Sequence, residues 1–136
     1  MKQKLINDFA NALISETLSG HRAWNPISPQ PDGLAEKNES LYFLLFENEY
    51  HKVFYEDSYS LPFQEGFFYF VHEWTESGRD GTIFDGYNLY VQPNLESKIT
   101  LLLHDSPELY RLKNAILEKD RLPEDVERFI CNFLES

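Results

Sequence analysis

The sequence is short of cysteine, of long apolar runs and of basic residues. A single cysteine, Cys131, excludes a disulfide within the chain and is typical of a reducing compartment. The longest unbroken apolar run, Leu41 to Phe46, has six residues, far fewer than the roughly 20 that a membrane-spanning helix needs. We therefore expect a cytoplasmic protein that does not enter a membrane.

The shortage of basic residues bears on the kind of partner. The 136 residues include 12 Lys and Arg against 23 Asp and Glu, for a net charge of −11. Nine of the eleven excess negative charges fall within residues 36–105. A nucleic-acid-binding surface needs the opposite sign, because Lys and Arg provide its affinity by displacing counterions. The charge disfavours nucleic acid and anionic membranes as partners and favours a basic protein.

The distribution of apolar and turn-forming residues predicts a single α+β domain over residues 1–136. Apolar side chains recur at helical spacing within residues 2–19, and Gly20 supplies a left-handed stop. Residues 21–40 hold three of the seven prolines and few core-forming side chains, so we expect a loop there. Because helices flank a region rich in aromatics, the pattern favours helices packed on one face of a sheet.

The middle of the chain has the composition of strands. Aromatic and branched apolar residues predict an antiparallel meander of about five strands, near residues 41–47, 50–56, 66–75, 82–92 and 97–104. The third strand is apolar on both faces until Glu73, which indicates a central position. The last two strands alternate between apolar and polar residues, so each is expected to have one solvated face.

Two helices are predicted after the sheet. Ser106 and Pro107 suit the start of the first, which would turn Leu109, Leu112 and Ile116 toward the core. The second follows Pro123 and carries a complete apolar stripe, formed by Val126, Phe129, Ile130, Phe133 and Leu134. We expect both helices to pack on one sheet face.

Catalytic motifs are weakly represented. The segment from His72 to Glu76 lacks the second histidine of a zinc-protease helix and has strand composition. Asp85, followed by Glu96 and Lys98, matches the Asp and Glu-x-Lys arrangement by which metal-dependent nucleases hold an ion and activate water. We keep a metal-dependent nuclease or hydrolase as an alternative, and otherwise expect neither catalytic residues, nor a metal, nor a cofactor.

The acidic and aromatic middle of the chain predicts a protein-binding surface. Tyr and Trp are the residues that interfaces favour as anchors, and carboxylates around them would attract a basic partner. The alternative is that the charges only keep an aromatic sheet soluble and block pairing at its edges. The residues expected at the binding surface are Glu49, Tyr50, Glu56, Asp57, Tyr59, Trp74, Glu76 and Asp80.

The chain resembles, at the level of class, the small immunity proteins that bacteria make against polymorphic and contact-dependent inhibition toxins. The resemblance consists of the short length, the acidity between Glu47 and Asp85, the single α+β domain and the lack of a catalytic motif. It implies a cytoplasmic protein that binds a cognate toxin domain, often a basic nuclease, and covers its active site. We expect a non-enzymatic protein that is a monomer or weak dimer. A nucleic-acid mimic or another acidic adaptor protein remains a further alternative.

Overall fold

The fold is α+β, as the sequence predicts. The computed structural model describes residues 2–28, 38–119 and 124–136. In chain order the elements are α1 (Lys2–Leu18), β1 (Asn25–Pro26), α2 (Glu39–Leu44), β2 (His51–Val53), the short 3-10 helix η2 (Tyr55–Asp57), β3 (Tyr59–Phe63), β4 (Gly66–Glu76), β5 (Ile83–Gln92), β6 (Thr100–His104), α3 (Pro107–Lys119) and α4 (Glu124–Glu135).

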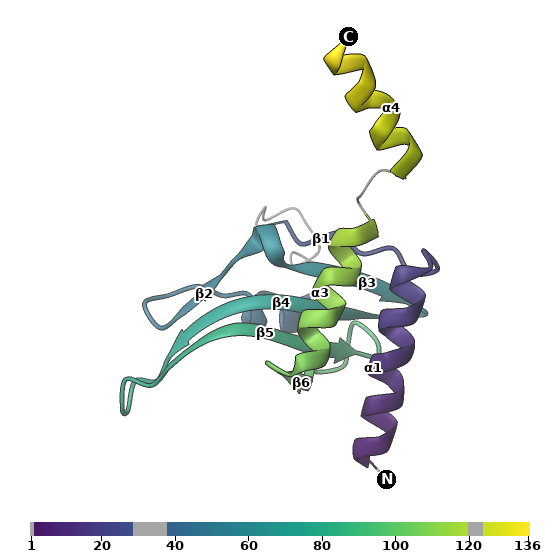
Figure 1. Cartoon of the computed structure of the whole chain (residues 1–136). Coiled ribbons are helices and arrows are strands. Elements are labelled where there is room, and N and C mark those ends of the chain that lie inside the picture. Colours follow the sequence, from purple (N-terminus) through teal and green to yellow (C-terminus); the bar gives the residue numbers. More distant parts are fainter. Residues whose placement is uncertain (1, 29–37, 120–123) are drawn as a thin grey trace.

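The sheet is antiparallel and is built around β4. Its order is β1-β3-β4-β5-β6, and β2 pairs with β4 outside this path. β3 pairs with the first half of β4, where Tyr59 lies opposite Phe70. β2 pairs with the second half, where His51 lies opposite Thr75. The β4–β5 pair therefore runs the whole length of the sheet and continues beyond the helices as a curved hairpin (Figure 1).

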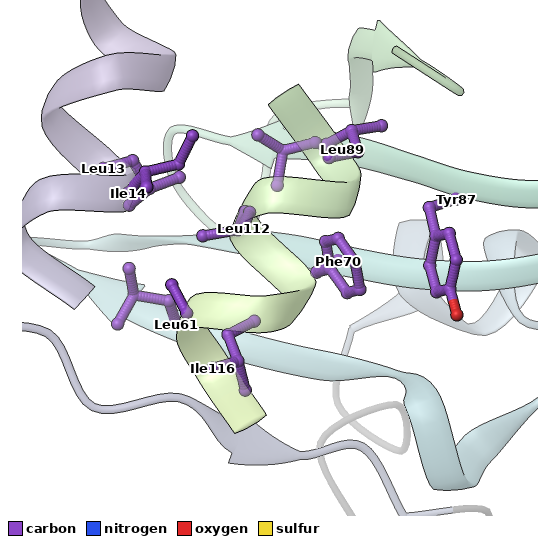
Figure 2. Packing of buried hydrophobic residues seen from close by; sticks show 10 residues of the cluster. Leu13, Ile14, Leu61, Phe70, Tyr87, Leu89, Leu112 and Ile116 are labelled. Atoms are coloured by element: carbon purple, nitrogen blue, oxygen red, sulfur yellow. The ribbon is translucent and has the colours of Figure 1, made fainter. Parts of the chain in front are cut away.

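Both faces of the sheet are buried in its middle. On one face, α1 and α3 pack over β3, β4 and β5, and Phe70, Leu89 and Leu112 lie in this core (Figure 2). On the other face, α2 packs over β2 and β4 through Leu41, Leu45, Val53, Tyr69 and Val71. Because residues alternate along β4, Phe70, His72 and Trp74 share the α1/α3 face, and Tyr69, Val71 and Glu73 share the α2 face.

Helix α2 is held on its face by a buried polar cluster. The Asn38 side chain accepts a hydrogen bond from Leu41 N, which caps the helix, and it donates to the Tyr69 hydroxyl oxygen at 3.0 Å and to Gln92 Oε1 at 2.8 Å. Asn38 and Gln92 are almost completely buried, so these bonds join the helix start to two strands in a region of low dielectric.

Several predicted boundaries are corrected. The strand expected at 41–47 is helix α2, and the 50–56 strand is reduced to β2 followed by η2. β3 was not predicted, and the last strand is shorter, at Thr100–His104. The predicted loop at 21–40 includes β1 and the start of α2, while residues 29–37 lie outside the described residues. The helix at 2–18, the strands at 66–76 and 83–92 and the two C-terminal helices are confirmed.

Two predictions about packing are wrong. β5 was expected to have one solvated face, but both of its faces are buried over its middle, because Asn88 is buried as well as Leu89. Helix α2, which covers the second face, was not predicted. Of the two C-terminal helices, α3 packs against α1 and β5, and its Leu109, Leu112 and Ile116 are buried. The described side chains of α4 are exposed, and the helix extends away from the sheet (Figure 1). Within the described residues, no helix is long and apolar enough to cross a membrane.

Candidate protein-binding surface

A histidine between two carboxylates marks the part of the α1/α3 face that lies beyond α3. His72 Nδ1 is 3.2 Å from Asp57 Oδ2 of η2, and its Nε2 is 2.9 Å from Asp85 Oδ1 of β5. A carboxylate only accepts hydrogen bonds, so the ring makes both bonds when both of its nitrogens donate. The two contacts place acidic side chains from η2 and β5 on either side of one ring.

The ring of His72 is itself held by aromatic neighbours. It lies 4.5 Å from the Tyr87 ring and 4.3 Å from the Phe54 ring, measured between centroids. Tyr87 in turn stacks on buried Phe70, and Lys113 of α3 lies over the Tyr87 ring. The cover of α3 ends at this stack, because Asp85, the next residue of β5 on the same face, is exposed.

Beyond His72, the same face carries Trp74 and Glu76, both partly exposed. Trp74 lies opposite Asp85 on β5 and opposite Lys52 on β2. Glu76 N donates to Tyr50 O at 2.9 Å, which places the exposed Tyr50 beside the end of β4. We call this uncovered part of the sheet, formed by Lys52, Asp57, His72, Trp74, Glu76 and Asp85, the distal acidic surface.

The other predicted binding residues are not among those that define this surface. Glu49 is exposed in the turn before β2, and Asp80 is exposed in the loop that closes β4 and β5. The Asp80 carboxylate accepts a hydrogen bond from Thr82 N, and this bond lowers the pKa of Asp80. Glu56 is exposed on η2, whereas Tyr59 packs against Phe70 and belongs partly to the core.

A second set of polar residues, which no sequence pattern predicts, lies on the α2 face. Glu73 is 3% exposed, and its two oxygens accept hydrogen bonds from His51 Nε2 at 2.8 Å, from Asn88 Nδ2 at 2.9 Å and from the Tyr90 hydroxyl. His104 Nδ1 extends the cluster by a bond to Asn88 Oδ1. The cluster joins four strands, which makes it a structural tie behind the distal acidic surface.

The charges in this cluster are set by the hydrogen bonds. Burial alone would raise the pKa of Glu73, but the bonds from His51, Asn88 and Tyr90 hold it below its ordinary value. The bond to Glu73 raises the pKa of His51, and burial opposes that effect only in part. His51 Nδ1 also donates to Phe46 O, so the charged ring is satisfied on both sides.

The residues of the nuclease alternative are not brought together. Asp85 lies near the start of β5 and contacts His72, whereas Glu96 and Lys98 follow the end of β5 at Gln92. Seven residues of extended strand separate Asp85 from Gln92, a distance of about 23 Å. Among the residues that the structure describes, no group of three or more His, Cys, Asp or Glu side chains is placed to hold a metal ion.

The sequence predicts Asp57, Trp74 and Glu76 of the distal acidic surface as binding residues, but it does not predict His72 or Asp85 there. His72 lies in a segment of strand composition, and its partners come from η2 and β5, which no local pattern connects. A usable signal was the alternation along β4, which places His72 and Trp74 on one face. Comparison of the chain with protein-family models, with curated proteins and with solved structures found no match.

Proposed function

We propose that this chain is a non-enzymatic inhibitory binding protein that docks its distal acidic surface on a basic protein. The observation that carries the proposal is the pair of carboxylates, Asp57 and Asp85, fixed on either side of His72 next to Trp74. This arrangement offers negative charge and an aromatic anchor on a part of the sheet that the helices leave uncovered.

The geometry favours binding for a physical reason. Carboxylates that are already held by hydrogen bonds lose little side-chain freedom when a partner's Lys or Arg approaches them. Long-range attraction speeds the encounter, and burial of Trp74 and Tyr50 would slow dissociation. Since the surface is built on paired strands rather than on a loop, its shape is present before the partner arrives.

The partner that fits best is a basic enzyme domain, such as a nuclease toxin. A site that holds phosphate groups is electropositive, and it attracts carboxylates by the same interaction. An acidic protein that occupies such a site prevents substrate from entering, which is inhibition without chemistry. This is the mode of action that the resemblance to bacterial immunity proteins implies, and we extend it to this chain as a proposal.

The experiment tests whether this chain neutralises a candidate toxin. The candidate is the protein encoded by the gene next to the gene for this chain, which we call the neighbouring protein. We expect that co-expression of this chain restores growth of cells that produce the neighbouring protein, and that the two proteins purify together. The double reversal Glu76→Lys with Asp80→Lys should weaken both effects. A matched reversal, Glu96→Lys, changes an exposed carboxylate beyond the opposite end of β5 and should weaken neither. If the neighbouring protein is harmless or does not bind, the inhibitory role is contradicted.

A further inference from the structure

Helix α4 presents an apolar stripe that the rest of the described chain does not cover. Phe129, Phe133 and Leu134 are each about three quarters exposed, at 75%, 75% and 76%, and Val126 and Ile130 are 40% and 42% exposed. The stripe of α3 has the same spacing, and there Leu109 and Leu112 are buried. An isolated helix of this length is only marginally stable in water, so α4 requires a surface to cover its stripe.

The same chain carries an apolar groove that is open to solvent. The groove has a volume of about 230 Å³ and lies between α1 and β3, and we call it the α1/β3 groove. Its apolar lining is formed by Phe9, Ala12, Leu13, Leu61, Phe63 and Phe68. Phe63 is 41% exposed, which is high for a phenylalanine that already contacts Phe68. Phe9, Phe63 and Phe68 are the aromatic surfaces on which a further phenylalanine would pack.

Charge is compatible with the seating of α4 in this groove. Helix α4 carries four acidic residues and one basic residue, Arg128, so its net charge is negative and the acidic middle of the chain would repel it. The groove instead lies mainly in residues 1–35, where acidic and basic residues balance, and its rim is an ion pair between Arg22 and Glu16. An anionic membrane surface is disfavoured by the same acidic positions.

We propose that α4 of one chain seats in the α1/β3 groove of a second copy, and that the second copy returns its own α4 to the first. The proposal concerns elements other than the distal acidic surface and does not depend on the proposed function. Figure 1 shows α4 beyond the end of α3 and away from its own sheet, so the helix is free of contact with its own sheet.

The reciprocal exchange provides the area that a stable dimer needs. A buried phenylalanine removes roughly 150–250 Å² from water, and two exchanged helices contribute four phenylalanines besides their aliphatic residues. If the groove and the surface of α1 and β3 around it lose a similar area, the total lies at the lower end of the roughly 1,200–2,000 Å² of a specific interface. A two-fold arrangement also closes the assembly at two copies, because each groove and each helix is then used.

The test is the mass of the full chain in solution, measured by light scattering after size exclusion over a dilution series. We expect twice the chain mass of 16.1 kDa. The double variant Phe129→Ala with Phe133→Ala and, separately, Ala12→Glu should each raise the dissociation constant of the dimer at least tenfold. Ala12 is exposed on α1 within the groove, and Phe63→Ala provides a second groove variant should Ala12→Glu fail to fold. Leu5→Glu, exposed on α1 outside the groove, is the matched control and should remain a dimer.

Mixing the Ala12→Glu variant with the phenylalanine double variant distinguishes this interface from direct pairing between two α4 helices. Ala12→Glu keeps an intact α4, and the phenylalanine double variant keeps an intact groove, so the mixture should form a heterodimer with one seated helix. Neither variant should form that dimer alone. A wild-type chain that stays monomeric at every concentration overturns the proposal, whether α4 is free or returns to its own groove. A wild-type dimer that neither groove variant weakens overturns it as well.

Discussion

Glu73 is the residue on which the β2–β4 pairing most depends. It is a charged group in the interior, and its cost is offset only because three donors from β2 and β5 surround it. β2 begins directly after Tyr50, whose carbonyl oxygen accepts a hydrogen bond from Glu76 N. The buried carboxylate on one face of the sheet therefore helps to position the aromatic and acidic groups on the other.

Removal of this carboxylate should be costly. We expect Glu73→Ala to lower the free energy of unfolding by about 3 kcal/mol, because His51, Asn88 and Tyr90 lose their shared acceptor in a buried site. Chemical denaturation followed by fluorescence measures the change. Glu96→Ala, at an exposed carboxylate, should stay within about 0.5 kcal/mol of the wild type. Equal effects of the two substitutions would contradict the structural role of Glu73.

The His51–Glu73 pair also predicts a dependence of stability on pH. The pKa of His51 is raised above 6.5, so its contribution is complete below that value and is lost as the pH rises through the folded pKa. The pKa of Glu73 is lowered below 4.5, so its contribution is complete above that value and is lost as the pH falls through the folded pKa. The pair should therefore stabilise the fold most between about pH 4.5 and pH 6.5.

This dependence is measured as the difference in free energy of unfolding between the wild type and His51→Ala at several pH values. The difference should be largest near pH 5.5 and should shrink toward pH 9. His21→Ala, at an exposed histidine outside the cluster, is the control substitution. Parallel pH profiles for the wild type and His51→Ala would show that the pair does not titrate as the structure indicates.

At the scale of the elements, the β4–β5 pair is the platform of the distal acidic surface, and its first residues fit tightly against the end of β5. A methyl group on Gly66 would lie 2.0 Å from Gln92 O and 2.5 Å from Pro93 O. Both are main-chain atoms, so a side chain at this position requires the strands to separate. Gly78, in the hairpin loop at the other end of β4, has no atom within 4 Å of such a methyl group.

The two glycines form a matched pair. We expect Gly66→Ala to destabilise the chain by about 3 kcal/mol through overpacking against the backbone of β5, and Gly78→Ala to leave the free energy of unfolding within about 0.5 kcal/mol of the wild type. Thermal and denaturant unfolding measure both. A neutral Gly66→Ala would mean that the β3–β4 turn does not approach β5 as closely as described.

Elements with a long, regular pattern were predictable, and short ones were not. α1, α3 and β4 repeat their apolar residues over several turns or pleats, which defines both type and boundary. The six apolar residues from Leu41 to Phe46 suit a strand or a helix equally, and the Asn38 cap decides in favour of α2. β3 was not predicted because it contains Pro62, which has no N–H to donate to a neighbouring strand. The proline is tolerated because β1 pairs only with Tyr59 and Ser60, so Pro62 lies beyond the β1 pairing.

The candidate surface was predictable in composition but not in arrangement. Trp74, Glu76 and Asp57 were expected from charge and aromatic content, and they lie on or beside one face. The bond that joins Asp57 to Asp85 through His72 depends on three elements, and the Glu73 cluster depends on four strands. Contacts of this kind are set by the tertiary fold, so local periodicity has no means of indicating them.

At the scale of the whole molecule, the distal acidic surface, the groove and the apolar stripe of α4 are formed by different residues. The distal acidic surface lies toward the β4–β5 hairpin, whereas the groove lies beside α1 and the apolar stripe lies on α4 (Figure 1). The distal acidic surface is suited to a basic protein, whereas the groove and the α4 stripe are suited to a second copy of the chain. A dimer formed through α4 would leave both distal acidic surfaces accessible, so the two proposed interactions are compatible.

The measurement that tests the central claim most directly is the association rate constant with the neighbouring-gene protein as a function of salt concentration. If the distal acidic surface steers a basic partner, the wild-type rate should fall steeply as salt rises. Glu76→Lys with Asp80→Lys should lower the rate at low salt by about tenfold and flatten its dependence on salt, while Glu96→Lys should follow the wild type. A rate that is independent of salt, or unchanged by the double reversal, would contradict the account.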